Sequence, residues 1–282
     1  MSRPKLTVTT IVYDEETLLP GMLLSVANIA DDIVIGIDSR TTDRSEKIAR
    51  LFDARIFRFD WCDDFSAGRN LALDRAKGDW ILSIDADERL TPFGASMIKA
   101  VMRQPDPRVG GYCFETASMT LTGHVSHTET STLRLWAHHP QTRYTGRVYE
   151  HLAHRGVLVK AGILRGGIGL MLFGGDPVLY ETRQKGERYL RLLEMQRMDK
   201  PNDRLTAYLI AHQQRINGQI VAAAASAEVA LAMEGELSEE ALAELHALAR
   251  AVLKTTDAPG YATTALIPKS SYRLMKAPPA RG

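Results

Sequence analysis

A short apolar segment of the chain ends abruptly in three acids. Residues 80–84 have the composition of a buried strand, and they are followed by Asp85-Ala86-Asp87-Glu88. Because successive side chains of an extended backbone point to opposite faces, Asp85 and Asp87 should project to the same side, about 7 Å apart. Two carboxylates at that spacing can share Mg²⁺ or Mn²⁺, which keep open positions for phosphate oxygens. The pattern predicts a nucleotide-diphosphate substrate.

Three more polar clusters follow predicted strands or open a predicted helix. The ring of Tyr13 could stack on a base, Asp38 could accept from a uracil N–H or a ribose hydroxyl, and Arg69 could give bidentate contacts to diphosphate oxygens. Each cluster also has a plainer interpretation. For the Tyr13 cluster it is an acidic first helical turn, which the helix dipole favours. For the Asp38 cluster it is a polar loop with a helix cap, and for the Arg69 cluster it is a surface arginine.

Strands and helices alternate through the first ninety residues, which predicts βαβ units and a mostly parallel sheet. The expected strands are 6–12, 33–38, 54–59 and 80–84, and the expected helices are 18–30, 44–52 and 66–76. Asp43 with Glu46 three residues later fits a helix N-cap with its capping partner. Open α/β sheets bind ligands at the carboxyl ends of their strands, so the four polar clusters should meet at one edge.

The pattern of predicted strands and helices changes twice after residue 90. A helix at 91–102 and β-type pieces at 111–116, 132–136 and 157–160 predict an antiparallel extension that covers and shapes the site. From about residue 177 the pattern is helical, and one helix pair resembles a single helix-turn-helix repeat unit. We therefore expect a catalytic domain at 1–175, a helical region at 176–255 and an irregular tail at 256–282.

Composition indicates a soluble, cytoplasmic protein. The 282 residues carry a formal net charge of +1, and no run of about 18 apolar residues suggests a membrane span. Cys62 and Cys113 are the only cysteines, so a disulfide framework is not expected. The tail offers basic residues for peripheral association with the inner face of an anionic membrane, although a solvated tail is the favoured interpretation. These residues are Lys269, Arg273, Lys276 and Arg281.

Taken in order, the clusters resemble the family 2 glycosyltransferases with a GT-A fold. More narrowly, the chain is similar to a bacterial subgroup of lipopolysaccharide-core glucosyltransferases and peptide S-glycosyltransferases. The resemblance is dense over 6–90, looser to about 155, and rests on YDEE at 13–16, DSRTTD at 38–43, FSAGRNLAL at 65–73 and GDWILSIDADE at 78–88. It implies an α/β domain with a mostly parallel sheet flanked by helices, followed by an α-helical region.

The resemblance also implies an activity: inverting transfer of a sugar, a hexose in our expectation, from a nucleotide-diphosphate sugar, commonly UDP-linked, with Mn²⁺ or Mg²⁺. It assigns roles to residues as follows. The nucleotide pocket would be lined by Ile11, Tyr13, Asp14 and Glu15, with Asp38 on the base or ribose, Arg69 and Asn70 near the donor, and Asp85, Ala86 and Asp87 on ribose, metal and diphosphate. The expected metal ligands are Asp85, Asp87 and His151, and the expected catalytic acids are Glu150, Asp87 and Glu88.

Two positions depart from the pattern of the subgroup. A Val-His-Glu tripeptide is usual there, whereas this chain has Val148-Tyr149-Glu150-His151. Glu150 aligns with the acid and is our first choice for the catalytic base, with Glu88 second. Glu150 could equally be a structural acid paired with Arg147 or Arg155. Asp14 stands where an asparagine is more frequent.

Alternative functions stay open at this level. One is a nucleotide-sugar-binding adaptor that has lost catalysis, and another is a nucleotidyltransferase. The acceptor could be a glycan, a lipid-linked sugar, a protein or a modified nucleobase. The helical region could serve acceptor docking, homo-oligomer formation or simple packing.

Overall fold

The computed structural model describes residues 3–120, 123–174 and 184–255. It divides the chain into two compact units, 1–176 and 177–282, which we describe separately. The expected tail at 256–282 lies outside the described residues, and so do its four basic side chains.

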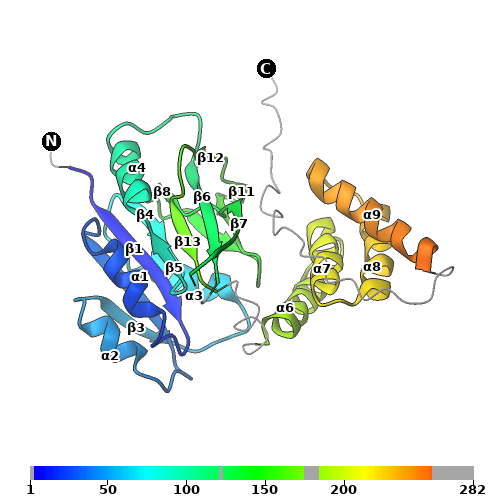
Figure 1. Cartoon of the computed structure of the whole chain (residues 1–282), viewed down its shortest axis with the longest axis horizontal. Helices are drawn as coiled ribbons and strands as arrows, with labels where there is room; N and C mark the ends of the chain where they lie inside the picture. The colour runs from blue at the N-terminus through cyan, green and yellow to red at the C-terminus, as the bar shows by residue number, and fades with distance from the viewer. Residues whose placement is uncertain (1–2, 121–122, 175–183, 256–282) are drawn as a thin grey trace. The chain divides into compact units, whose positions relative to one another are not determined.

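The first unit begins with a parallel sheet. Strands β1 (Leu6–Val12), β2 (Asp32–Asp38), β3 (Arg55–Phe59) and β4 (Trp80–Ser83) lie side by side in the order β3-β2-β1-β4, all parallel (Figure 1). They are connected by α1 (Leu19–Val26), α2 (Ser45–Arg50) and α3 (Phe65–Leu73). The predicted alternation is confirmed, although the helices are shorter than predicted. This order places the carboxyl ends of the four strands at one edge of the sheet.

The capping box predicted at the start of α2 is wrong. The Asp43 carboxylate accepts from the N–H of Ser45 (2.9 Å) and from the N–H of Glu16 (2.7 Å), and α2 begins only at Ser45. Glu46 pairs instead with Arg58 on β3. Asp43 therefore joins the loop after β1 to the loop after β2, a contact that a local sequence pattern does not contain.

Beyond β4 the sheet continues with both antiparallel and parallel pairs, so the predicted antiparallel extension is confirmed only in part. The order beyond β4 is β8 (Leu135–Ala137), β6 (Gly111–Met119), β13 (Leu170–Leu172) and β5 (Glu88–Leu90). β8 is antiparallel to both β4 and β6, whereas β13 runs parallel to β6. Helix α4 (Pro92–Arg103) follows β5, while β7 (Val125–Thr130) and β12 (Ala161–Leu164) pair with β6. The predicted α/β class is confirmed, with parallel pairing concentrated in the first four strands.

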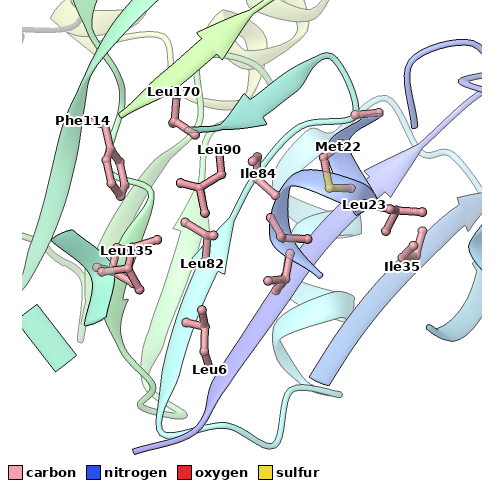
Figure 2. Packing of buried hydrophobic residues seen from close by; sticks show 14 of the residues in the cluster. Leu6, Met22, Leu23, Ile35, Leu82, Ile84, Leu90, Phe114, Leu135 and Leu170 are labelled. Atoms are coloured by element: carbon pink, nitrogen blue, oxygen red, sulfur yellow. The ribbon is translucent and has the colours of Figure 1, made fainter. Parts of the chain in front are cut away.

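A separate antiparallel sheet is formed by β9 (Thr142–Thr145), β10 (His151–His154) and β11 (Val157–Leu158). Alternate residues of β4 connect the two layers of the core. Leu82 packs in the larger cluster with residues of β1, α1 and β6, including Leu6 and Met22 (Figure 2). Ile81, its neighbour, packs in a second cluster with Leu73 of α3 and residues of β8, β9 and β10. This second cluster holds α3 and the small sheet against β4.

The second unit is helical, as predicted. Its helices are α6 (Lys185–Asp199), α7 (Arg204–Ile216), α8 (Ile220–Ala232) and α9 (Glu239–Thr255). Between α7 and α9, Glu244 accepts from Arg215 (2.7 Å) and Tyr208 (2.8 Å) and pairs with His212 (2.8 Å). Burial disfavours the charged form of Glu244, but these hydrogen bonds and charges outweigh it and lower its pKa to about 2.

A search of the described helices finds none with both the length and the apolar composition needed to cross a membrane.

Candidate active site

The acidic turn after β4 is organised by Glu88. Its Oε2 accepts the backbone N–H of Asp85 (2.9 Å), and its own N–H donates to the Asp85 carbonyl (2.9 Å). Ala86 and Glu88 are buried, whereas Asp85 and Asp87 are half-buried. Because β4 ends at Ser83 and the Glu88 N–H closes a turn on the Asp85 carbonyl, the extended geometry assumed for the two aspartates is not present here.

Two arginines bind the acids of this turn, Arg69, which is buried, and Arg134, whose side chain is 12% exposed. Arg69 of α3 donates through Nη2 to Asp85 Oδ1 (2.8 Å) and through Nε to Glu150 Oε1 (2.6 Å). Arg134, immediately before β8, donates through Nη2 to Asp85 Oδ2 (2.9 Å) and to Glu88 Oε1 (2.6 Å). We call the chain Glu150–Arg69–Asp85–Arg134–Glu88 the ion network. It joins residues from four separate parts of the first unit.

Burial and charge pull the pKa values of the network in different directions. Burial would raise the pKa of Asp85, but the charges of Arg69 and Arg134 outweigh it and hold that pKa well below its usual range. For Glu88, burial outweighs Arg134, and Asp85 and Asp87 add repulsion, so the pKa rises to about 7. Asp85 is therefore firmly ionised, whereas Glu88 titrates near neutrality.

The two arginines keep unused donors. Within the described residues, Nη1 of Arg69 and Nε of Arg134 are buried without a hydrogen-bond partner. Buried donors are normally satisfied by protein, water or ligand, because an unsatisfied one costs about 1–3 kcal/mol. The guanidinium of Arg69 also lies over the Tyr144 ring at 5.7 Å. Such donors at the end of the sheet fit an oxygen-rich anionic ligand.

The predicted metal ligand set is not assembled. Among the residues that the structure describes, no group of three or more His, Cys, Asp or Glu side chains is arranged to hold a metal ion. Each oxygen of Asp85 accepts from a guanidinium, so a cation placed there would face two positive charges. His151 directs Nε2 to the Thr145 hydroxyl of β9 (2.7 Å).

Asp87 remains compatible with a divalent cation. It is half-buried, and its carboxylate lies so close to Gly174 that a side chain at position 174 would collide with it. Magnesium is commonly bound through one or two carboxylates together with substrate phosphates. Asp87 is thus compatible with a cation that also binds a diphosphate, whereas both oxygens of Asp85 are engaged by arginines.

Two predicted pocket residues make hydrogen bonds that connect separate segments of the first unit. Asp14 has a positive φ of 49°, and its Oδ1 accepts from the N–H of Thr42 (2.8 Å) and of Asp43 (3.3 Å), so it fixes one loop to the next. Asn70 was expected near the donor, but its amide exchanges two hydrogen bonds with the backbone of Tyr144 (3.0 and 2.9 Å). This contact fastens β9 to α3.

The remaining residues of the predicted nucleotide pocket lie at the ends of β1 and β2. The Tyr13 ring is 46% exposed, whereas Asp38 is buried and bound by Arg40. Ile11 packs its side chain between Gly36 and Gly68, beneath α3. The carbonyl of Glu15 accepts from the first turn of α1, and its N–H donates to Ser45.

Glu150 is positioned by an unusual backbone. Gly146 and Tyr149 both have positive φ values (98° and 52°), and the latter is rare for a bulky residue. The Gly146 carbonyl accepts from the Ser66 hydroxyl (2.6 Å) at the start of α3. The alternative pairing of Glu150 with Arg147 or Arg155 is wrong, because its partner is Arg69.

Sequence reasoning missed Arg134. It lies 46 residues from Glu88 and 49 from Asp85, and it precedes a strand of only three residues. No local pattern distinguishes it from a surface arginine at the start of a strand. Only the antiparallel pairing of β8 with β4 brings it to the acidic turn.

A comparison of the chain with models of protein families gives a match. The model described as glycosyl transferase family 2 matches residues 7–157. Over 148 residues the chain is 36% identical to a TPR repeat-containing protein of Synechococcus elongatus, covering 52% of this chain and 35% of that protein. Over 154 residues it is 29% identical to the SPbeta prophage-derived glycosyltransferase SunS of Bacillus subtilis, covering 52% and 34%. The matched part spans about a third of the length of these relatives.

Similarity to solved structures is low. Residues 1–349 of TarS from S. aureus, in complex with UDP-GlcNAc, give a TM-score of 0.47 with 12% identity, covering 77% of this chain and 75% of that chain.

Replacing Arg134 by methionine should destabilise the first unit strongly. At pH 8 the change leaves the buried carboxylate of Glu88 without its guanidinium partner, and breaking a buried ion pair in this way costs about 3–5 kcal/mol. Chemical unfolding followed by tryptophan fluorescence measures it, because Trp61, Trp80 and Trp136 all lie in this unit. Arg108→Met removes an exposed ion pair and should change little. Equal unfolding midpoints for the two variants would contradict the assigned role of Arg134.

The pKa of Glu88 predicts a slope in stability with pH. The folded protein holds this proton up to about pH 7, whereas an unfolded glutamate loses it near 4.5. Stability should therefore fall as pH rises from 4.5 to 7, by on the order of 3 kcal/mol in total. Unfolding free energies measured from pH 5 to 8 should show this fall in the native chain and in Glu46→Gln but not in Glu88→Gln. An unchanged slope in Glu88→Gln would exclude Glu88 as its source.

Proposed function

The chain belongs to glycosyl transferase family 2, and we propose that it transfers a hexose with inversion from a UDP-linked sugar to an acceptor hydroxyl or thiol. The observation that carries this proposal is the ion network, which fixes an acid, Glu150, beside Arg69 and the turn that follows β4. Proteins with open α/β sheets bind nucleotides at the carboxyl ends of the parallel strands. The network lies at this end of β4, which is where we expect the diphosphate of the donor to bind.

Donor binding is assigned to the loops at the ends of β1 and β2 and to the buried donors of the network. Tyr13 offers an exposed aromatic face, and Asp38 offers a carboxylate for a base or ribose N–H or O–H. The free Nη1 of Arg69 would donate to diphosphate oxygens and stabilise charge on the leaving group. Mn²⁺ or Mg²⁺ held by Asp87 would neutralise further diphosphate charge.

Glu150 has the properties required of the catalytic base. Arg69 holds Oε1, and Oε2 has no hydrogen-bond partner within the described residues, so one oxygen is available to a proton. In the proposed displacement the acceptor atom bonds to the anomeric carbon, the bond from that carbon to the diphosphate breaks, and the acceptor proton moves to Glu150. Glu88 is buried with both oxygens engaged, which suits a positioning role.

Replacing Glu150 by glutamine tests the proposal. Glutamine keeps an acceptor for Arg69 but cannot take a proton, so hydrolysis of a UDP-sugar, measured as UDP release, should fall about 100-fold or more. Thermal shifts with UDP-, GDP- and dTDP-sugars, each with and without Mn²⁺, should show that donor binding is kept. Glu46→Gln, a surface acid paired with Arg50 and Arg58, is the matched control and should retain full turnover.

Two results would contradict the proposal. Native turnover in Glu150→Gln would remove Glu150 as the base. Donor binding by the native chain without release of UDP from any sugar, even with Mn²⁺, would favour a nucleotide-sugar-binding protein without catalysis.

A further inference from the structure

Arg40 lies across the end of β2 and covers the buried carboxylate of Asp38. Its Nε donates to Asp38 Oδ1 (3.0 Å) and its Nη2 to Oδ2 (2.5 Å), which is a planar, bidentate contact. The backbone N–H of Arg40 also donates to Oδ1 (2.9 Å). Asp38 is only 2% exposed, whereas the Arg40 side chain is 54% exposed. The arginine is therefore the solvent-exposed member of this pair.

Two aromatic rings flank the same guanidinium. The Arg40 Cζ atom lies 5.0 Å from the centroid of the Tyr13 ring and 5.5 Å from that of Trp61. Trp61 is itself held, because its indole N–H donates to Asp63 (2.9 Å) and Phe65 packs edge-on against it at 4.8 Å. Tyr13 follows β1, Arg40 follows β2 and Trp61 follows β3, so the three side chains meet at the carboxyl edge of the sheet.

The guanidinium has the recognition features of a nucleobase. It is flat, it lies against aromatic rings, and it donates N–H groups in its own plane to a carboxylate. Uracil and guanine share these features, since each has a ring N–H on the edge that would face Asp38. A base bound in this way would use the same Asp38 oxygens and lie against the same rings as the guanidinium. The base and the guanidinium therefore cannot occupy this position at the same time.

We propose that Arg40 is an internal occupant of the nucleobase slot formed by Tyr13, Asp38 and Trp61, and that it must swing out before the base of the donor can reach Asp38. This inference rests on the proposed function. It makes Arg40 a determinant of donor affinity, because the apparent affinity is that of the open form multiplied by the fraction of molecules in which the slot is open. Exposure of the Arg40 side chain gives it solvent into which to move.

Electrostatics alone predicts the opposite effect of removing Arg40. A cation near the end of the sheet attracts an anionic diphosphate, so its loss should weaken nucleotide binding. If Arg40 blocks the slot, its loss should strengthen binding. The sign of the change therefore separates an occupant of the slot from a ligand of the phosphates.

The test is calorimetric titration of the full chain with UDP and with GDP. We expect Arg40→Ala to tighten binding of the cognate nucleotide about tenfold. Arg40→Lys, which can pair with Asp38 but lacks the planar, two-donor contact, should lie between the native chain and Arg40→Ala. The matched control is Arg58→Ala, because Arg58 is 51% exposed and also ion-paired, and it should leave the dissociation constant within about twofold.

A second comparison tests recognition of the base. ADP has no ring N–H on the edge that would face Asp38, so Arg40→Ala should improve its binding less than that of UDP or GDP. An equal gain for all three nucleotides would overturn the slot assignment and indicate a general effect on the fold.

The outcomes separate this inference from the proposed function. Nucleotide binding that is unchanged or weaker in both Arg40→Ala and Arg40→Lys overturns the role of Arg40 and leaves the proposed function standing. Failure of the native chain and of every variant to bind any of the nucleotides overturns the proposed function, and the inference with it. If Arg40→Ala does not fold because Asp38 loses its partner, the lysine variant alone decides, since it retains the charge.

Discussion

Burial of the acidic turn after β4 is possible only because two arginines are buried with it. Glu88 is buried and Asp85 is half-buried, and an uncompensated buried carboxylate would cost several kcal/mol. Arg69 and Arg134 supply the compensating charge from α3 and from the strand that extends the sheet. The packing of α3, the pairing of β8 and the geometry of the turn therefore depend on one another, and the position of Glu150 depends on all three through Arg69.

Short polar side chains hold the loops around this network in place. Asp14 and Asp43 connect the loop after β1 to the loop after β2, and Asn70 fastens β9 to α3. Each of these side chains bonds to backbone groups of another segment, so the loops have satisfied amides without regular structure. A rigid edge of this kind suits a transferase, because the donor and the base must keep a fixed geometry.

Arginine–carboxylate pairs recur at both ends of the proposed donor site. Asp38 is bound by Arg40 at the end of β2, and Asp85 is bound by Arg69 and Arg134 at the end of β4. The pairs differ in exposure, and this difference assigns them different roles. The half-exposed Arg40 can leave its partner, whereas the buried arginines of the network can only remain or unfold with it. The first pair therefore suits exchange with a ligand, and the second suits support of the site.

The sequence by itself determined the alternation of strands and helices, the acids at the strand ends and the family, because periodicity and short motifs are local properties of a chain. It also singled out Arg69 and Glu150, which the structure pairs with each other. The tertiary structure decided which charges meet: Arg134 reaches the acidic turn through the pairing of β8 with β4, Asp43 and Asn70 become connectors, and His151 bonds to Thr145. Apart from the last, which spans six positions within one hairpin, these contacts join residues some 25 to 80 positions apart and depend on strand order and register, which the motifs do not encode.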